Sequence, residues 1–466
     1  MDVFVVPVDG RYVVYRPLLP LAFVGNRAMA DLALRLAADP AAPAPDDARR
    51  FLADIGFLRP DPPEPPPPRR EWQPTTAVVL LTNRCNLRCT YCYANAGVAA
   101  PHDTSASLAT AAIDVVHGNA RATGAPRFTV CFHGGGEPMR AWGVMRAAAE
   151  HARAKDLPCE LTMVSNGVWS HAQRAWALAT LDGVTISIDG GPTTQDSQRP
   201  LASGRASSRF VLDTIRALDD SGHPYGIRMT ATAPFSRFAD DVRYLCEHTG
   251  CREFQVEPAF NTVRGSHRQS TPAEGAAFAA AFVEAYDVAA RAGRRLTYSG
   301  ARPWLRTRQF CTAPWDALIV NADGHLVTCY EIADESHWLA ELSTVGRLGE
   351  DATTTLDATA RCRLLDHLES RHAAQCRDCF CRWHCAGDCY TRSSTLGEDG
   401  ITATAERCEV NRTITAQLLL RGILASGGVA WRGEPVPAWC GEPVLAGGRA
   451  PVLAGGRAPV LAGGGG

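Results

Sequence analysis

Apolar runs with the length of strands alternate with amphipathic stretches through the middle of the chain. The runs that we read as strands are 77–82, 128–133, 161–165, 184–188, 227–232 and 254–256. Helix-like stretches lie between them, among them 108–116, 141–154 and 210–218. This alternation predicts an α/β fold in which helices wrap a parallel sheet, and six units are fewer than a closed eight-stranded barrel requires.

A clear helix start follows the last of these strands. Thr271-Pro272-Ala273-Glu274 has the pattern of a capping box with proline at the first helical position. We therefore predict a long helix that begins here and ends near Ala292.

The first 58 residues carry a separate pattern. The short strand-like runs 3–8 and 11–16 meet at Asp9-Gly10, which is a hairpin signal. Asn26 is placed to cap a helix, and 46–58 supplies a second helix. Residues 1–58 are thus predicted to form a small α+β module. Seven of the nine residues from Pro60 to Pro68 are proline, so we expect 59–74 to be a stiff linker.

The remaining boundaries follow from length and composition. A chain of 466 residues is too long for one ordinary core. We assign 75–300 to the partial barrel, 301–432 to a cysteine-rich domain and 433–466 to a tail. In that tail the eight residues from Pro443 recur at Pro451 and, truncated, at Pro459, and such Gly- and Pro-rich repeats cannot build a core.

Charge and cysteine content narrow the class of protein. A formal net charge of −2 with 46% hydrophobic residues describes a soluble globular protein and gives no electrostatic case for nucleic acid. No run approaches the ~20 apolar residues that span a bilayer, and residues 1–25 lack the pattern of a signal peptide. Seventeen cysteines then point to metal clusters in a reducing cytoplasm rather than to disulfides.

The most informative motif is Cys85, Cys89 and Cys92, with three and then two residues between them. This spacing lets three thiolates bind three corners of an iron–sulfur cube, which leaves the fourth iron without a protein ligand. A structural zinc site would be closed by four ligands, and no fourth cysteine lies nearby. Zinc and incidental cysteines are the alternatives.

With Tyr91 before the last cysteine, this run resembles the cluster motif of the radical S-adenosylmethionine (radical SAM) superfamily. The resemblance implies that the open iron binds the amino and carboxylate groups of S-adenosylmethionine and delivers one electron. Cleavage then produces a 5′-deoxyadenosyl radical. The resemblance also implies a partial barrel of six strands, (β/α)6, over this region.

The predicted strand ends carry further patterns of this superfamily. In parallel α/β domains the carboxyl ends of the strands form the active site. Glycines after the second strand allow close backbone approach to a ligand, and the glutamate beside them can accept from an ammonium group. A tight turn and surface ion pairs are the ordinary alternatives. The residues that we expect to contact the cofactor are Tyr91, Gly135, Gly136, Glu137, Asn166, Ser187, Asp189, Arg199 and Arg228. By resemblance, Ser187 and either Arg199 or Arg228 contact its ribose and carboxylate.

A second group of cysteines lies downstream. Its members are Cys311, Cys329, Cys376, Cys379, Cys385, Cys389 and Cys408, and Gly324 lies between the first two. The spacing resembles the SPASM extension of radical SAM enzymes that act on peptides and proteins; zinc ribbons are the alternative. The resemblance implies two auxiliary clusters, and therefore three [4Fe–4S] clusters with S-adenosylmethionine. We call Cys85, Cys89 and Cys92 the first cysteine set, Cys311, Cys329 and Cys389 the second, and Cys376, Cys379, Cys385 and Cys408 the third.

The chain departs from related sulfatase maturases at two places. Ala317 stands where they place a further ligand, so the second cysteine set is expected to leave an iron open. Tyr330 replaces their catalytic aspartate, and Glu331 is the candidate base or substrate contact one position later. An ordinary exposed carboxylate is the alternative. Cys381 lies outside the pattern and is either a replacement ligand or a spare thiol.

These observations predict an oxidoreductase of the radical SAM type that installs a thioether or carbon–carbon crosslink in a precursor peptide. Residues 1–58 resemble a winged-helix peptide-recognition element related to the pyrroloquinoline-quinone chaperone, which implies that they bind a leader sequence; a simple cap on the next domain is the alternative. Flavodoxin or ferredoxin is the expected electron donor. The rival functions are a formylglycine-type maturase, a peptide epimerase, and a non-enzymatic electron carrier or zinc module.

Overall fold

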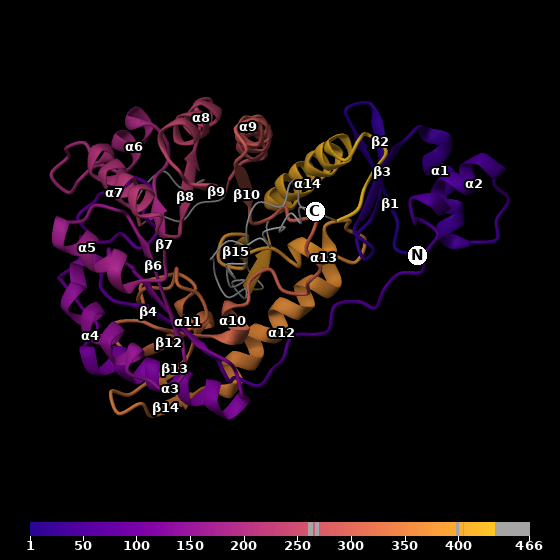
Figure 1. The fold of residues 1–466 in the computed structure, drawn as a ribbon. Coiled ribbons are helices and arrows are strands. Elements are labelled where there is room, and N and C mark those ends of the chain that lie inside the picture. The colour runs from indigo at the N-terminus through magenta and orange to yellow at the C-terminus, as the bar shows by residue number, and fades with distance from the viewer. Residues whose placement is uncertain (260–263, 266–269, 398–399, 404, 434–466) are drawn as a thin grey trace, which may run out of the picture.

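A single curved sheet dominates the computed structural model, which describes residues 1–259, 264–265, 270–397, 400–403 and 405–433 (Figure 1). Its eleven strands follow the order β10-β9-β8-β7-β6-β5-β4-β11-β12-β13-β14. The strands from β4 to β10 are parallel, and β10 does not pair with β4. The predicted partial barrel is therefore confirmed. Its strands are β4 Thr76–Leu80, β5 Phe128–His133, β6 Cys159–Ser165, β7 Gly183–Ser187, β8 Tyr225–Thr232, β9 Glu253–Ala259 and β10 Arg295–Tyr298.

Five strands extend the sheet beyond the six that were predicted. β10 adds a seventh parallel strand, which its four residues were too few to reveal by periodicity. On the opposite side, β11 runs parallel to β4 and leads into an antiparallel meander. Residues on both sides of position 300 therefore share one sheet. The added strands are β11 Ala317–Val320, β12 His325–Val327, β13 Thr344–Leu348 and β14 Thr354–Leu356.

Helices cover the outer face of the barrel (Figure 1). In β5, Phe128, Val130 and Phe132 are fully buried against the helices, whereas Cys131 and His133 alternate with them and line an internal cavity. The outer helices are α3 Ala106–Thr123, α4 Trp142–Arg153, α5 His171–Thr180, α7 Ser208–Ser221, α8 Phe238–His248 and α9 Pro272–Arg291; η1 Pro138–Ala141 and α6 Pro192–Gln198 are short connections. The capping box at Thr271 and Glu274 is present at the start of α9, as predicted.

The N-terminal residues form a second, smaller sheet with the order β1-β2-β3-β17. The predicted hairpin and both helices are present, and Asn26 caps α1. One face of the sheet packs on α1 and α2, and the other packs on α14 near the end of the chain. β17 extends the sheet by pairing with β3. The elements are β1 Phe4–Val8, β2 Arg11–Arg16, β3 Leu21–Gly25, α1 Arg27–Ala38, α2 Asp46–Asp54, α14 Ala405–Ala425 and β17 Ala430–Trp431.

The cysteine-rich region lies between this small sheet and the barrel (Figure 1). Its elements are α10 Ala313–Asp316, α11 Ala340–Ser343, α12 Ala358–Gln375, α13 Arg382–Cys385, β15 Ser394–Gly397 and β16 Gly400–Ala403. The proline-rich segment has no regular structure, and Arg308 holds it through the carbonyl of Pro65 at 2.7 Å. Apart from Gly433, the predicted tail lies outside the described residues. Among the helices of the described ranges, none has the length and apolarity to cross a membrane.

Candidate active site

The first cysteine set lies on the loop after β4, at the carboxyl edge of the barrel. All three thiols line a cavity of about 1410 Å³ that continues into the barrel. Burial raises the pKa of Cys85 to about 12, and the charges of Glu137 and of the other two thiols add to this effect. The backbone N–H of Leu87 donates to the Cys85 sulfur at 3.4 Å. Burial thus disfavours the thiolate form of Cys85 unless a positively charged group lies beside it.

The glycine run after β5 fixes the backbone of this loop. The N–H of Gly136 donates to the carbonyl of Thr82 at 2.7 Å, and the N–H of Glu137 donates to the carbonyl of Arg84 at 2.8 Å. A Cβ on Gly136 would lie 2.2 Å from the Arg84 oxygen, and a Cβ on Gly135 would lie 2.8 Å from the Ala333 side chain. Glycine is thus required here by protein packing. The expected contact of these glycines with the cofactor stays a prediction.

Glu137 joins the ends of two neighbouring strands. Its carboxylate accepts from the hydroxyl of Ser165 at 2.6 Å and from the N–H groups of Asn166 at 2.8 Å and Met139 at 3.2 Å. Burial raises the pKa of this carboxyl group above its ordinary value. A carboxylate has about four acceptor positions, so one remains for the ammonium group that we predicted as its partner. The Asn166 amide donates to Asn86 at 2.7 Å, within the first cysteine loop.

The two candidate arginines differ sharply in their surroundings. Tyr91 donates to Asp189 at 2.5 Å and accepts from Arg199 at 2.6 Å, and Asp189 also accepts from the N–H of Thr230 at 2.9 Å. Arg199 is 8% exposed, so its charge is held inside the protein by Asp189 at 3.8 Å. This triad fixes the aromatic residue between the last two cysteines of the first set.

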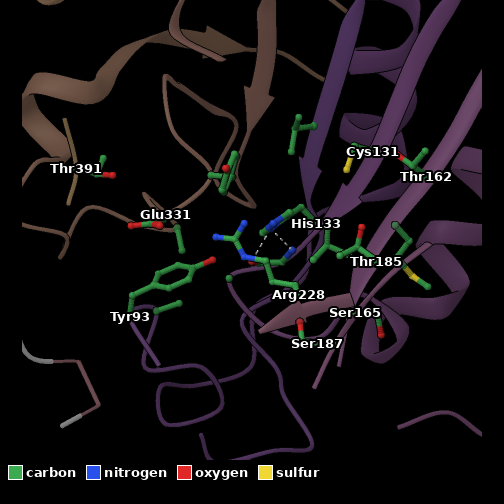
Figure 2. A pocket seen from close by; sticks show the side chains of 18 of the residues that line it. Tyr93, Cys131, His133, Thr162, Ser165, Thr185, Ser187, Arg228, Glu331 and Thr391 are labelled. Atoms are coloured by element: carbon green, nitrogen blue, oxygen red, sulfur yellow. Dashed lines mark hydrogen bonds between the residues drawn. The ribbon is translucent and has the colours of Figure 1, made fainter. Parts of the chain in front are cut away.

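Arg228, by contrast, has no hydrogen-bond or ion-pair partner in the described part of the chain. It lies beside Ser187, its register partner on β7, and its side chain points into the cavity close to His133 (Figure 2). Burial lowers the pKa of His133 to about 4, and the charge of Arg228 acts in the same direction, so the ring beside Arg228 is neutral. Arg228 is therefore the guanidinium that is free to bind a carboxylate.

The second cysteine set is brought together from three distant segments. Burial raises the pKa of Cys311 to about 11, and the charge of Cys389 contributes to this rise. Burial also raises the pKa of Cys329, and the charges of Cys389 and Cys311 add to that rise. The N–H groups of Ala313 and Glu331 donate to the sulfurs of Cys311 and Cys329, both at 3.4 Å. Ala317 begins β11 and packs in the apolar cluster that contains Cys329.

The third cysteine set also converges. Burial is the main cause that raises the pKa of Cys376 and that of Cys385. The charges of Cys379 and Cys408 add to the effect on Cys376, and the charges of Cys376 and Cys408 add to the effect on Cys385. The unassigned Cys381 is buried beside this set, and a hydrogen bond from its thiol lowers the pKa of Cys379. Cys381 thus lies within reach of the third set.

Glu331 is buried rather than exposed. Arg392 binds its carboxylate through Nε at 2.7 Å and through a second nitrogen, and Arg392 also pairs with Glu257 at 3.2 Å. Burial alone would raise the pKa of Glu331, but Arg392 and then Arg228 lower it below its ordinary value. A carboxylate whose pKa is lowered by a paired arginine is a weak base, so this geometry favours the substrate-contact role over the base.

Four cavity residues escaped the sequence analysis as site residues. Tyr93, which directly follows the first cysteine set, is 41% exposed and projects into the cavity (Figure 2). Tyr330 lies against His133 with ring centroids 4.8 Å apart. The signal for His133 was present, since it ends a strand whose alternate residues face the barrel interior. The position of Arg392 depends on contacts that no local pattern encodes.

Comparison with known proteins identifies the barrel. Residues 79–234 match the family model of the Radical SAM superfamily. This part of the chain is a radical SAM domain. The match begins inside β4, includes the first cysteine set and ends after β8, so it covers the strand ends described above.

Two curated relatives share parts of the chain. The sporulation killing factor maturation protein SkfB of Bacillus subtilis (strain 168) is 26% identical over 298 residues, which are 62% of this chain and 66% of SkfB. Pre-heme d1 synthase of Dinoroseobacter shibae is 28% identical over 217 residues, which are 46% of this chain and 50% of that protein. The chain thus spans between half and two thirds of these relatives.

Solved structures show the same fold. Native anSMEcpe with bound AdoMet superposes with a TM-score of 0.59 at 16% identity and covers 76% of this chain and 100% of its own. The same protein with AdoMet and the Cp18Cys peptide gives a TM-score of 0.57 at 16% identity, with 76% of this chain and 98% of that chain covered.

The radical SAM domain implies a [4Fe–4S] cluster and S-adenosylmethionine, and its residues fit both. In the described ranges, no three Cys, His, Asp or Glu side chains stand close enough to hold a single metal ion. Cysteines around a cube instead bind separate irons, and all three thiols of the first cysteine set line the same cavity. The contacts of Arg228 and Glu137 with the carboxylate and ammonium groups of S-adenosylmethionine stay predictions.

Proposed function

We propose that this chain is an oxidoreductase that modifies a ribosomally synthesised precursor peptide and installs an intramolecular thioether or carbon–carbon crosslink. The observation that carries the proposal is the arrangement of the three cysteine sets. The first lines the cavity, and the loops of the other two contribute Tyr330, Glu331, Arg392 and Arg407 to the same cavity wall. The name of SkfB, a maturation protein, supports a peptide substrate.

The residues of the cavity then have separate tasks. The first cysteine set would hold the cluster. Together with S-adenosylmethionine, that cluster would provide the radical that abstracts a hydrogen atom from an unactivated carbon. Arg228 and Glu137 bind the carboxylate and ammonium groups, and the Tyr91 triad fixes the loop between them. Tyr93, Tyr330 and Glu331 line the side on which a peptide segment enters, and closure over it excludes water from the reacting carbon.

Crosslinking removes two hydrogens from the peptide. One leaves as a hydrogen atom, and the other leaves as a proton and an electron. We assign that electron to auxiliary clusters on the second and third cysteine sets, whose neighbouring residues Tyr330, Arg392 and Arg407 line the cavity. Flavodoxin or ferredoxin supplies the electron that starts each turnover.

The N-terminal sheet is the proposed site for the leader sequence. β17 already pairs with Ala22 and Phe23 of β3, so the outer edge of β1 is the edge open for an added strand. Pro7 lies on the outer edge of β1 and has no backbone N–H. Val5 is therefore the central residue of this edge that can donate a backbone hydrogen bond.

Anaerobic purification with iron analysis tests the proposal. We expect about twelve irons for three clusters, release of 5′-deoxyadenosine, and a precursor peptide lighter by two hydrogens in mass spectrometry. The precursor is to be sought among short open reading frames beside this gene. Zinc in place of iron, or no cleavage of S-adenosylmethionine, contradicts the proposal.

A second experiment tests whether the third cysteine set takes part in electron transfer. Replacing Cys376 and Cys379 with Ala should leave about eight irons and measurable cleavage, but should sharply reduce crosslinked peptide. A soluble variant with this iron content that crosslinks at the unmodified rate excludes electron transfer through the third set.

A further inference from the structure

Arg302 ties the second cysteine set to the third. Its guanidinium Nη2 donates to the carbonyl of Phe310 at 3.0 Å and to the carbonyl of His384 at 3.2 Å. Phe310 directly precedes Cys311, and His384 directly precedes Cys385. One side chain therefore binds the backbone next to a cysteine of each set. The guanidinium also packs over the Phe310 ring, 5.3 Å from its centroid.

The charge of Arg302 has no carboxylate partner among the described residues. Its Nε is buried without a hydrogen bond. The carboxylates whose charges reach it are already paired, because Glu257 binds Arg392 at 3.2 Å and Asp388 binds Arg407 at 2.8 Å. A guanidinium out of water costs free energy unless an anion lies nearby.

The groups that can compensate this cation are the two cysteine sets. Burial lowers the pKa of Arg302, and the sulfurs of Cys385 and Cys311, once ionised, are the groups that oppose this shift most strongly. Arginine stays protonated in proteins, so the cation is permanent. An anionic site on either side of Arg302 would therefore be stabilised by it.

We propose that Arg302 is a positioning and counter-charge residue shared by the second and third cysteine sets. The inference rests on the proposed function, because it takes both sets to hold clusters. A cluster bound by thiolates becomes more negative when it is reduced, so a nearby fixed cation stabilises the reduced state and raises the reduction potential. Arg302 thus makes both auxiliary clusters better electron acceptors for the peptide.

The test is a redox titration of the full-length protein monitored by electron paramagnetic resonance. Arg302→Met should lower the midpoint potentials of both auxiliary clusters and leave that of the first cluster unchanged. Arg302→Lys keeps the charge and should restore most of the potential, while the loss of the two-carbonyl contact changes the line shape of the signals.

Arg361 provides a matched control. It also donates to two carbonyls, those of Arg70 and Trp315, its Nε is buried without a partner, and burial lowers its pKa. No member of the three cysteine sets is among the charges that act on it. Arg361→Met should therefore leave all midpoint potentials in place.

Every outcome of these measurements either supports or overturns the role of Arg302. A fully loaded Arg302→Met protein with unshifted auxiliary potentials overturns the inference, as does an equal shift in Arg361→Met. If Arg302→Met loses iron, Arg302→Gln, which keeps two N–H donors, carries the same measurement and the same criterion. An unmodified protein with only about four irons overturns the proposed function as well, and iron analysis before titration separates the two failures.

Discussion

The loop of the first cysteine set and the walls of the other two sets are held by different forces. Backbone hydrogen bonds and close glycine contacts fix the first loop against the strand next to it. The second and third sets depend on buried ion pairs that run in a row from Glu331 to Arg392, Glu257, Arg407 and Asp388. We call this row the charge row. The first region is therefore held chiefly through its backbone by the neighbouring strand, with the Tyr91 triad as a buried charge pair, whereas the second depends on a row of buried charges from several segments.

This difference has an energetic consequence. Removing one partner of a buried ion pair leaves an uncompensated charge and costs about 3–5 kcal/mol. Glu257 is 4% exposed, and it is the member of the charge row that comes from the barrel. It connects the barrel to segments beside Cys389 and Cys408. Perturbing backbone packing should thus disable the first set, and perturbing charge should disable the other two.

The largest effect is expected from removing the ligands of the first cysteine set, because this change should stop cleavage of S-adenosylmethionine and leave the other two sets loaded. Replacing Cys85, Cys89 and Cys92 with Ala should abolish 5′-deoxyadenosine formation, because the first cluster loses all its protein ligands. About eight irons should remain on the other sets. Undiminished cleavage by the triple variant would end the assignment of this set.

A backbone change should disable the first region alone. Gly136→Ala places a methyl group 2.2 Å from the carbonyl oxygen of Arg84, so the loop must move and about a third of the iron should be lost. Gly143→Ala is the control, since its Cβ meets nothing within 4 Å. Full iron and full cleavage in the Gly136 variant would show that the loop adapts.

A charge change should disable the second region. Glu257→Gln should lower the free energy of unfolding by about 3–5 kcal/mol and reduce iron on the second and third sets, as measured by chemical denaturation and iron analysis. The control is Asp287→Asn, which removes the partner of Arg421 at the other end of α14. That pair is 36% and 23% exposed, so a loss of no more than about 1 kcal/mol is expected. Equal losses in both variants would contradict the distinction.

The smallest expected effect concerns the N-terminal sheet. Deleting residues 1–58 would also uncover α14, because Val13 and Tyr15 pack on Leu419 and Ile423. Val5→Pro is a milder change that removes the backbone donor at the open edge of β1. We expect leader binding to weaken by about tenfold, close to the ~1.4 kcal/mol of one hydrogen bond, with cleavage of S-adenosylmethionine unchanged. Calorimetric titration with the leader peptide measures this affinity. An unchanged affinity would show that the leader sequence does not bind at the edge of β1.

Local pattern was sufficient for much of this molecule. The six parallel strands, the hairpin at Asp9-Gly10 and the capping box at Thr271 follow from periodicity and from hydrogen bonds between residues a few positions apart. The cysteine spacing also indicated the radical SAM domain, because ligands of one cluster on one loop must be close in sequence. β10 and β17 were missed, since strands of four and two residues contain no measurable period.

Only the tertiary structure decided which charges are free. Arg199 and Arg228 were equivalent candidates in the sequence, yet Asp189 and Tyr91 bind the first and nothing described binds the second. Glu331 became a partner of Arg392, 61 residues away. The reason is physical: the state of a buried charge depends on neighbours that the fold brings from other segments, whereas periodicity and spacing report only on residues that are near in the chain.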